Sequence, residues 1–192
     1  PTVLFFQNTP HATVTKEDTT PRMTLPDSWD MYKAALPRKY RHELERKIRK
    51  MEREHPDLQI GESTDPSGDL RFLFDLMGKD TEKKAFLTRQ MQTFFTGITA
   101  AFEKNVSLLF VTLGDKKIAV TYSFIYENTY YLYNSGFDKT CCANAGFYLK
   151  AMSIKHAIEK GLHEYNFLQG PERYKYELGG KDFGVYTIAY RF

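Results

Sequence analysis

The feature that most constrains the fold of this chain is a change of hydrophobic period after Asn105. Before this point apolar residues recur at helical spacing, whereas the following segments read as strands. Three segments rich in Val, Ile, Phe and Tyr cover residues 107–113, 118–126 and 129–135. They are joined by Gly114-Asp115-Lys116 and Glu127-Asn128, which are good hairpin turns. The pattern therefore predicts an antiparallel meander of three strands.

Helices are expected on both sides of this meander. Ser28 suits the N-cap of a first helix, and Pro37 suits the first turn of a second helix that ends before Pro56. The other expected elements are a strand at 58–62, a turn at 65–68, a short helix ending near Gly78, a long helix from Thr81 to about Lys104, a helix at 145–160 stopped by Gly161, a strand at 164–168, a loop at 169–181 and a strand at 185–191. The long helix is expected to turn these residues inward: Phe86, Leu87, Met91, Phe94, Phe95, Ile98 and Phe102.

The first 26 residues differ from the rest of the chain. Residues 3–7 are predicted to form a short strand, and residues 9–26 are polar and interrupted by prolines, as a connector is. We therefore expect an N-terminal strand and connector at 1–26, followed by one domain at 27–192. Because the first residue is Pro1 rather than Met, we expect the chain to be a piece of a longer protein.

Composition excludes several classes of protein. The 27 Lys and Arg against 24 Asp and Glu give a net charge of +3, too small an excess to indicate nucleic-acid binding by itself. No apolar run reaches the roughly 18–20 residues of a membrane span, and no signal peptide is visible. Cys141 and Cys142 are adjacent, and with 5 scattered His they form no metal-binding spacing, so no metal is expected. A reducing, cytoplasmic location is the default interpretation.

Two places are candidates for binding an anion. The helix that begins after Pro37 carries eight Lys or Arg, opposed by four Glu that can pair with them at i,i+4 spacing. This face is either a solvated helix surface, which we favour, or a basic surface for nucleotide phosphate or RNA. The second place is the loop at 136–144, which leads into a helix beginning at Asn144-Ala145-Gly146. Free backbone N–H groups at such a helix start attract anions, although many capped helices look alike.

Several short motifs together resemble a known family. They are YNSGFD at 133–138, NAG at 144–146, AIEKG at 157–161, EYNFLQG at 164–170, YKY at 174–176, LPxSWxxY at 25–32 and YRxELxRKxRK at 40–50. The chain resembles the BioF2-like, or cellulose-biosynthesis CelD-like, branch of the GNAT acyltransferases, which is related to the Fem-type (FemAB-like) aminoacyltransferases. The match covers roughly residues 25–182. Since typical members of the branch have two GNAT-like halves, the chain looks like the second half.

The resemblance implies an α/β (α+β) fold with a mixed, mostly antiparallel sheet and helices on both faces. It implies that the pantetheine of an acyl-CoA lies where strand 129–135 splays from strand 164–168. The pyrophosphate would then bind at the helix start, at Asn144, Ala145, Gly146 and Phe147. This sequence departs from the common glycine-rich loop, because residues 142–147 contain one glycine and no leading Gln or Arg. Fem-type enzymes use aminoacyl-tRNA as the donor, and that alternative stays open.

Acyl transfer to an amine needs a base, an oxyanion donor and an acid. The candidates are Asp138 and Glu172 as bases, Tyr174 or Tyr176 as the acid, and Lys175 for an oxyanion or phosphate. The alternatives are a capping Asp in a loop, a solvated Glu and a Lys whose stem packs between rings. The two cysteines are interpreted as inert or loop cysteines, because neither has a His or Asn partner at a useful distance in sequence.

These observations predict an N-acyltransferase. The favoured reaction moves acetyl from acetyl-CoA, as co-substrate, to an amine on a small molecule or a cell-envelope or polysaccharide precursor. The expected partners are a CoA ester and an amine acceptor, with tRNA less favoured. The alternatives are Fem-like transfer from aminoacyl-tRNA and a non-catalytic GNAT-like binding module.

Overall fold

The computed structural model describes residues 2–191 of the chain. Its helices are α1 (Thr2–Gln7), α2 (Trp29–Ala35), α3 (Arg38–Glu54), α4 (Pro66–Met77), α5 (Thr81–Phe86), α6 (Arg89–Ala101), the 3₁₀ turn η1 (Glu103–Asn105), α7 (Ala145–Glu159) and α8 (Arg173–Glu177). Its strands are β1 (Ala12–Thr19), β2 (Arg22–Thr24), β3 (Leu58–Glu62), β4 (Val106–Leu113), β5 (Lys116–Tyr126), β6 (Thr129–Phe137), β7 (Glu164–Asn166) and β8 (Gly184–Tyr190).

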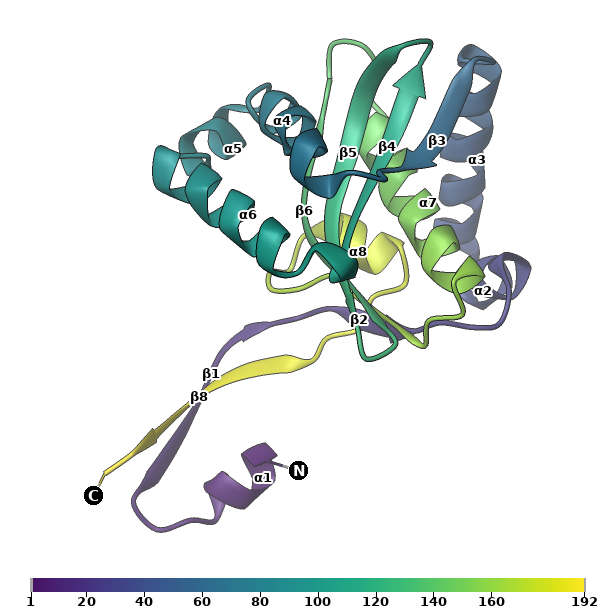
Figure 1. Cartoon of the computed structure of the whole chain (residues 1–192). Helices are drawn as coiled ribbons and strands as arrows, with labels where there is room; N and C mark the ends of the chain where they lie inside the picture. Colours follow the sequence, from purple (N-terminus) through teal and green to yellow (C-terminus); the bar gives the residue numbers. More distant parts are fainter. Residues whose placement is uncertain (1, 192) are drawn as a thin grey trace.

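The body of the molecule is a six-stranded sheet with helices on both faces (Figure 1). The strand order is β2-β7-β6-β5-β4-β3, and every neighbouring pair is antiparallel except β6 and β7, which run parallel. Helix α7 packs against β4, β5 and β6 and is covered in turn by α3. Helix α4 packs on the same three strands and contacts α6, on the opposite side of the sheet. The expected mixed, mostly antiparallel sheet is confirmed.

The meander predicted from the sequence forms the centre of this sheet. The turn between β5 and β6 places Glu127 and Asn128 at φ of 45° and 59°, the left-handed conformations that a two-residue hairpin of this twist requires. Gly114, in the turn between β4 and β5, also has a positive φ, of 53°. The two hairpin turns expected from the sequence are therefore present, and the register shifts once along each hairpin, at Val111 and Thr112 and at Tyr122 and Ser123.

The predicted boundaries of α2, α3 and α7 are confirmed to within a residue or two. Ser28 caps α2 by accepting a hydrogen bond from the Met31 N–H at 3.2 Å. Gly161 ends α7 with a φ of 70°, which a glycine adopts without steric cost. The predicted strand at 58–62 is β3. The segment at 169–181, expected to be a loop, contains the short helix α8.

The long helix expected at 81–104 is instead broken in two. The Thr88 side chain accepts a hydrogen bond from the Met91 N–H and starts α6 as a separate helix. Of the predicted inward residues, Phe95 is fully buried against Tyr122, whereas these are exposed: Phe86 at 43%, Phe94 at 45% and Phe102 at 52%. The prediction assigned too many residues to the buried face of the helix. Successive residues are 100° apart on a helix, so Phe94 cannot share the face of Phe95.

The N-terminal segment also differs from the expectation. Residues 3–7 lie in the helix α1 rather than in a strand, and residues 9–26 contain β1 and β2 rather than a connector. Strand β2 pairs with β7 at the edge of the main sheet. Strand β1 pairs with β8 in a two-stranded ribbon that projects from the body in Figure 1. The ribbon was missed because β1, with the sequence ATVTKEDT, lacks the apolar alternation of a half-buried strand.

Apolar residues form a separate core on each face of the sheet. The larger core lies under α7 and includes Leu44 and Met51 of α3. The smaller core lies under α4 and α6 and is centred on Phe95. No helix within residues 2–191 has the length and apolar character that crossing a membrane requires.

A polar cluster joins β3 to α7. Glu62 accepts a hydrogen bond from the Ser107 hydroxyl at 2.7 Å, and its carboxylate lies 3.3 Å from His156 Nε2 and 3.2 Å from Lys160 Nζ. The contact with His156, followed by those with Ser107 and Lys160, lowers the pKa of Glu62 to about 2. The carboxylate therefore stabilises the fold only in its charged form.

This cluster predicts acid sensitivity. The pKa of Glu62 is lowered in the fold from 4.5 to about 2, so the unfolded chain takes up the proton first as the pH falls. We expect the stabilisation by Glu62 to be complete above pH 4.5 and to be lost as the pH falls toward about 2. Urea unfolding at several pH values tests this, with Glu62→Gln as the comparison. An identical acid limb in both proteins would contradict the prediction.

Candidate active site

The central feature of the site is a separation of two neighbouring strands. Strands β6 and β7 pair only through Thr129–Tyr131 and Glu164–Asn166, after which β6 continues to Phe137 without β7 beside it. The register between β5 and β6 shifts at Tyr122 and Ser123, which leaves Tyr133 as an extra residue that bends β6. On the other side, Leu168 at a φ of 58° turns the chain away after β7. The two strands therefore splay apart at the middle of the sheet.

A cavity of about 200 Å³ lies in this splay. Its walls are Leu132, Tyr133, Asn134 and Ser135 of β6, the segment Phe167-Leu168-Gln169, Lys83 of α5, and Glu172, Tyr174 and Lys175 at α8. We call it the splay cavity. Three of the five residues named as catalytic candidates from the sequence line it, namely Glu172, Tyr174 and Lys175.

The Lys175 ammonium is bound by backbone carbonyls and a carboxylate of the same chain. Its side chain is 2% exposed, and its ammonium donates hydrogen bonds to the backbone carbonyls of Leu168 at 3.0 Å, Gln169 at 2.8 Å and Gly170 at 3.1 Å. The same ammonium lies 2.8 Å from the Glu172 carboxylate. An ammonium has three protons to donate, so these contacts use its capacity. In this arrangement Lys175 shapes the wall of the cavity, and the role predicted for it with an oxyanion or phosphate stays a prediction.

The sequence analysis missed two further lysines, Lys83 on the cavity wall and Lys150 beside Tyr174. Lys83 donates to the backbone carbonyl and the hydroxyl of Ser135. Lys150 of α7 places its ammonium 4.2 Å from the centre of the Tyr174 ring. Burial lowers the pKa of both, and that of Lys150 falls to about 7, while the nearby Glu172 charge acts in the opposite direction. Lys150 could have been identified from the sequence as a candidate site residue, because it interrupts the apolar run that starts at Ala145.

Asp138, the other predicted base, lies outside the residues that line the splay cavity. Its buried carboxylate accepts hydrogen bonds from Lys79 at 2.6 Å, the Thr140 hydroxyl at 2.6 Å and Lys116 at 3.2 Å. The hydrogen bond from Lys79, with those from Thr140 and Lys116, holds the pKa of Asp138 well below its usual range. Because a carboxylate with so low a pKa is a weak base, Glu172 is the better placed of the two candidates.

The two tyrosine candidates have different surroundings. Burial raises the pKa of Tyr174 far above its usual value, so its phenol keeps its proton at any ordinary pH. The hydroxyl of Tyr176 donates to the Asp182 carboxylate at 2.6 Å, and Tyr176 is not among the residues that line the splay cavity. Tyr174 is the better placed of the two possible acids because it lines the splay cavity, although its raised pKa makes it a weak proton donor.

Gly146, which the sequence analysis named at the start of α7, is required for packing. A Cβ added at Gly146 would lie 2.6 Å from the Phe137 ring, so this glycine makes room for a side chain of β6. Asn144 precedes the helix without a capping hydrogen bond from its side chain, and Ala145 N–H bonds to the Cys142 carbonyl at 3.0 Å. The predicted pyrophosphate site at residues 144–147 stays a prediction.

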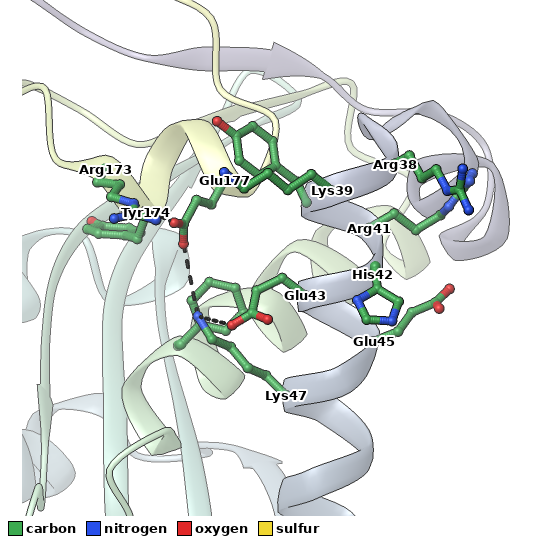
Figure 2. Close-up of a pocket in the computed structure, with 12 residues that line it drawn as sticks. Arg38, Lys39, Arg41, His42, Glu43, Glu45, Lys47, Arg173, Tyr174 and Glu177 are labelled. Atoms are coloured by element: carbon green, nitrogen blue, oxygen red, sulfur yellow. Dashed lines mark hydrogen bonds and ion pairs between the residues drawn. The ribbon is translucent and has the colours of Figure 1, made fainter.

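Beside the splay cavity is a large basic groove between α3, the start of α7 and α8 (Figure 2). It has a volume of about 1160 Å³, and Tyr174 lines both spaces. Its lining residues are Arg38, Lys39, Tyr40, Arg41, His42, Glu43, Glu45, Lys47, Phe147, Arg173, Tyr174 and Glu177. On the wall of the groove the Lys47 ammonium lies 3.4 Å from Glu43 and 4.0 Å from Glu177, and 3.9 Å from the centre of the Phe147 ring.

The charges along α3 are only partly paired. The ion pairs predicted from i,i+4 spacing are present, with Glu43 and Lys47 at 3.4 Å, Glu45 and Arg49 at 3.7 Å, and Lys50 and Glu54 at 3.9 Å. The first turn, in contrast, carries basic side chains and no acidic one. Neither Arg38 nor Lys39 makes an ion pair within residues 2–191. Cations at a helix N-terminus oppose the helix dipole, so this end of the groove favours an anion.

Comparison with known proteins agrees with this fold. A family model described as an acetyltransferase (GNAT) domain matches residues 38–176. Among proteins with curated descriptions, none matches this chain in sequence. Similar solved structures include FemX, at 13% identity and a TM-score of 0.66 over 88% of this chain and 60% of the other.

Two further solved structures have the same overall fold. A conserved protein of unknown function from Bacteroides thetaiotaomicron VPI-5482 is 14% identical, with a TM-score of 0.65 over 94% of this chain and 62% of the other. The C-terminal domain of a putative lysylphosphatidylglycerol synthetase from Agrobacterium fabrum is 11% identical, with a TM-score of 0.65 over 93% and 61%. At these identities the likeness shows the fold alone, and this chain spans about 60% of the length of each structure.

Proposed function

Because this chain belongs to the acetyltransferase (GNAT) domain family, we propose that it transfers an acyl group, acetyl in the favoured case, from a CoA thioester to an amine. The observation that carries this proposal is the separation of β6 from β7, which leaves a strand edge without a partner beside the splay cavity. An extended arm with amide groups, such as pantetheine, can bond to a free strand edge much as another strand does. The acceptor class is an amine on a small molecule or on a cell-envelope or polysaccharide precursor.

The residues of the cavity can supply the chemistry. The acceptor nitrogen attacks the thioester carbonyl carbon, the carbon–sulfur bond breaks, and the nitrogen loses a proton. Glu172, on the cavity wall, is the base in this proposal. Lys83 and Tyr174 also line the cavity, and in this proposal the cation of Lys83 stabilises the negative charge that develops on the carbonyl oxygen while Tyr174 donates its proton toward the leaving sulfur.

The phosphates of the donor have a matching surface. The basic groove adjoins the splay cavity through Tyr174, and the unpaired Arg38 and Lys39 lie at its α3 end. A thioester in the splay would therefore leave the nucleotide end of the donor near the groove. Arg groups bind phosphate in two parallel hydrogen bonds, which suits this arrangement.

The test is thermal unfolding with and without acetyl-CoA. At about 100 times its dissociation constant the ligand should add about 2.7 kcal/mol, a shift of roughly 5–10 °C. We expect Arg38→Gln with Arg41→Gln to remove most of this shift. Arg53→Gln is the matched control, because Arg53 lies on the same helix, is 77% exposed and is outside the basic groove. No shift in the unaltered chain would contradict the proposal.

One observation favours a second candidate donor, an aminoacyl-tRNA. The basic groove is much larger than the splay cavity, and a further row of basic residues, Arg46, Arg49, Lys50 and Arg53, continues along α3. A nucleic-acid donor predicts that charged tRNA binds and that its affinity falls steeply with salt, because each phosphate contact releases counterions. If acetyl-CoA and charged tRNA both fail to bind, the chain is a GNAT-like module without a donor site of its own.

A further inference from the structure

The loop between β6 and α7 places two thiols beside an imidazole. The sulfur atoms of Cys141 and Cys142 lie 3.6 Å apart, and both cysteines are free. The Cys142 sulfur also lies 3.2 Å from Nε2 of His55, a residue 87 positions away in sequence. His55 directly follows α3, so the packing of α3 on α7 builds this cluster. The interpretation of the cysteines as inert rested on the lack of a sequence neighbour, and the fold supplies one from afar.

The two thiols have unequal surroundings. Cys141 is exposed, whereas Cys142 is 5% exposed and belongs to the larger core. Burial raises the pKa of the Cys142 thiol to about 11, and Cys141, Asp138 and Glu54 act in the same direction. Cys142 therefore keeps its proton at neutral pH unless a neighbour takes it. The Nε2 atom of His55 is within reach to accept that proton.

We propose that Cys141, Cys142 and His55 form a second reactive site, separate from the splay cavity, which reacts with small disulfides of the glutathione type and closes into a Cys141–Cys142 disulfide. The Cys141 thiol first loses its proton to solvent, and its sulfur attacks one sulfur of the small disulfide, forming a mixed disulfide and releasing one thiolate, which takes up a proton. Cys142 then loses its proton to His55, attacks the Cys141 sulfur and releases the second thiol. The protein loses two protons and two electrons, and one small disulfide takes them up to become two thiols.

The geometry fits this sequence of steps. The exposed sulfur is the one that an outside disulfide can reach, and the buried sulfur is already in contact with it at 3.6 Å. Because the two cysteines are adjacent, the bond closes a strained eight-membered ring, so the backbone of the loop must also change as the sulfur atoms approach from 3.6 Å to about 2.05 Å. The loop leads directly into α7, because the Cys142 carbonyl accepts the Ala145 N–H at 3.0 Å. Oxidation of the two cysteines would therefore change the loop at the N-terminus of α7, the helix whose Phe147 lines the basic groove.

The experiment treats the reduced, full chain with oxidised glutathione, stops the reaction by alkylation in denaturant, and measures the intact mass. The count is unambiguous because the chain has 2 Cys. We expect both thiols to become unreactive together, with no glutathione retained and no dimer on a non-reducing gel. Retention of one glutathione with one thiol still open to alkylation would overturn the proposal, as would a failure of either thiol to react.

Two variants separate the steps. Cys142→Ser should stop at the mixed disulfide and retain one glutathione on Cys141. His55→Gln should form the mixed disulfide at the normal rate but release the second glutathione at least about tenfold more slowly, because the base is gone. An unchanged second step in His55→Gln would remove His55 from the site. The measurement does not involve acyl-CoA, so its result is independent of the proposed acyl transfer.

Discussion

Replacing Lys175 with Met is expected to lower the free energy of unfolding by about 3 kcal/mol, a fall in Tm of about 6–12 °C. The Met side chain fills a similar space but donates no hydrogen bonds. The carbonyls of Leu168, Gln169 and Gly170 then lose their shared donor, and Glu172 loses its ion-pair partner. Each buried acceptor left without a donor costs about 1–3 kcal/mol, less where water can reach it.

The same substitution should also remove donor binding. The segment that Lys175 holds includes Leu168 at a φ of 58° and Gly170 at a φ of 109°, a backbone that does not keep its shape unaided. This segment is one wall of the splay cavity. We therefore expect the acetyl-CoA shift to disappear in Lys175→Met even at temperatures where the variant is folded.

Two comparisons make this prediction specific. Lys181→Met removes an exposed lysine close to the same loop and should change the unfolding free energy by less than about 0.5 kcal/mol. Lys175→Arg keeps the charge but presents a flat guanidinium to carbonyls arranged around one nitrogen, so an intermediate loss is expected. Thermal and urea unfolding measure all three. If Lys175→Met is as stable as Lys181→Met, the carbonyl contacts are not what orders the loop.

Much of this fold follows from local patterns in the sequence. The meander β4–β6 was predicted because its strands are rich in β-branched and aromatic residues and its turns require particular backbone conformations. Helices α2, α3 and α7 were predicted because their start and stop signals are local. Strand β8 was predicted at 185–191, but its pairing with β1 was not, because the two strands are far apart in sequence and β1 lacks a clear apolar alternation.

The site residues also fall into some that could be predicted from local sequence and others that could not. Tyr174 and Lys175 were candidates because the YKY segment at 174–176 resembles an aromatic-Lys segment of Fem-type chains, and Glu172 was a candidate base. Lys83 was missed, because only the fold brings it to Ser135, 52 residues away. His55 was missed as a partner of Cys142 for the same reason. Contacts between distant segments depend on the packing of α3, α5 and α7 on the sheet, and no local periodicity encodes which side chains then meet.

The second large effect is expected at Gly136, where a helix approaches β6 closely. A Cβ at this position would lie 2.6 Å from the Met77 nitrogen and 2.7 Å from the Leu76 carbonyl carbon. Both are backbone atoms at the end of α4, so no side chain can rotate away. We expect Gly136→Ala to lower the free energy of unfolding by about 2–4 kcal/mol, because α4 must shift while its buried residues Leu73, Leu76 and Met77 fill one core.

Gly97, in the neighbouring helix α6, provides a control in which added bulk should stabilise the protein. Gly97 lies in the exposed part of α6, and a Cβ there would meet nothing within 4 Å. Gly97→Ala should therefore raise the free energy of unfolding by about 0.5–1 kcal/mol, through helix propensity and a less flexible unfolded chain. Urea unfolding of both variants measures whether the free energy of unfolding falls in the first and rises in the second.

The shift of α4 in Gly136→Ala should also affect the site, because the end of α4 leads to Lys79 and Lys83. We expect it to loosen the contact of Lys83 with Ser135 and to weaken acetyl-CoA binding, whereas Gly97→Ala should leave acetyl-CoA binding unchanged. A Gly136→Ala protein as stable as the unaltered chain would mean that α4 is not packed against β6 in this way.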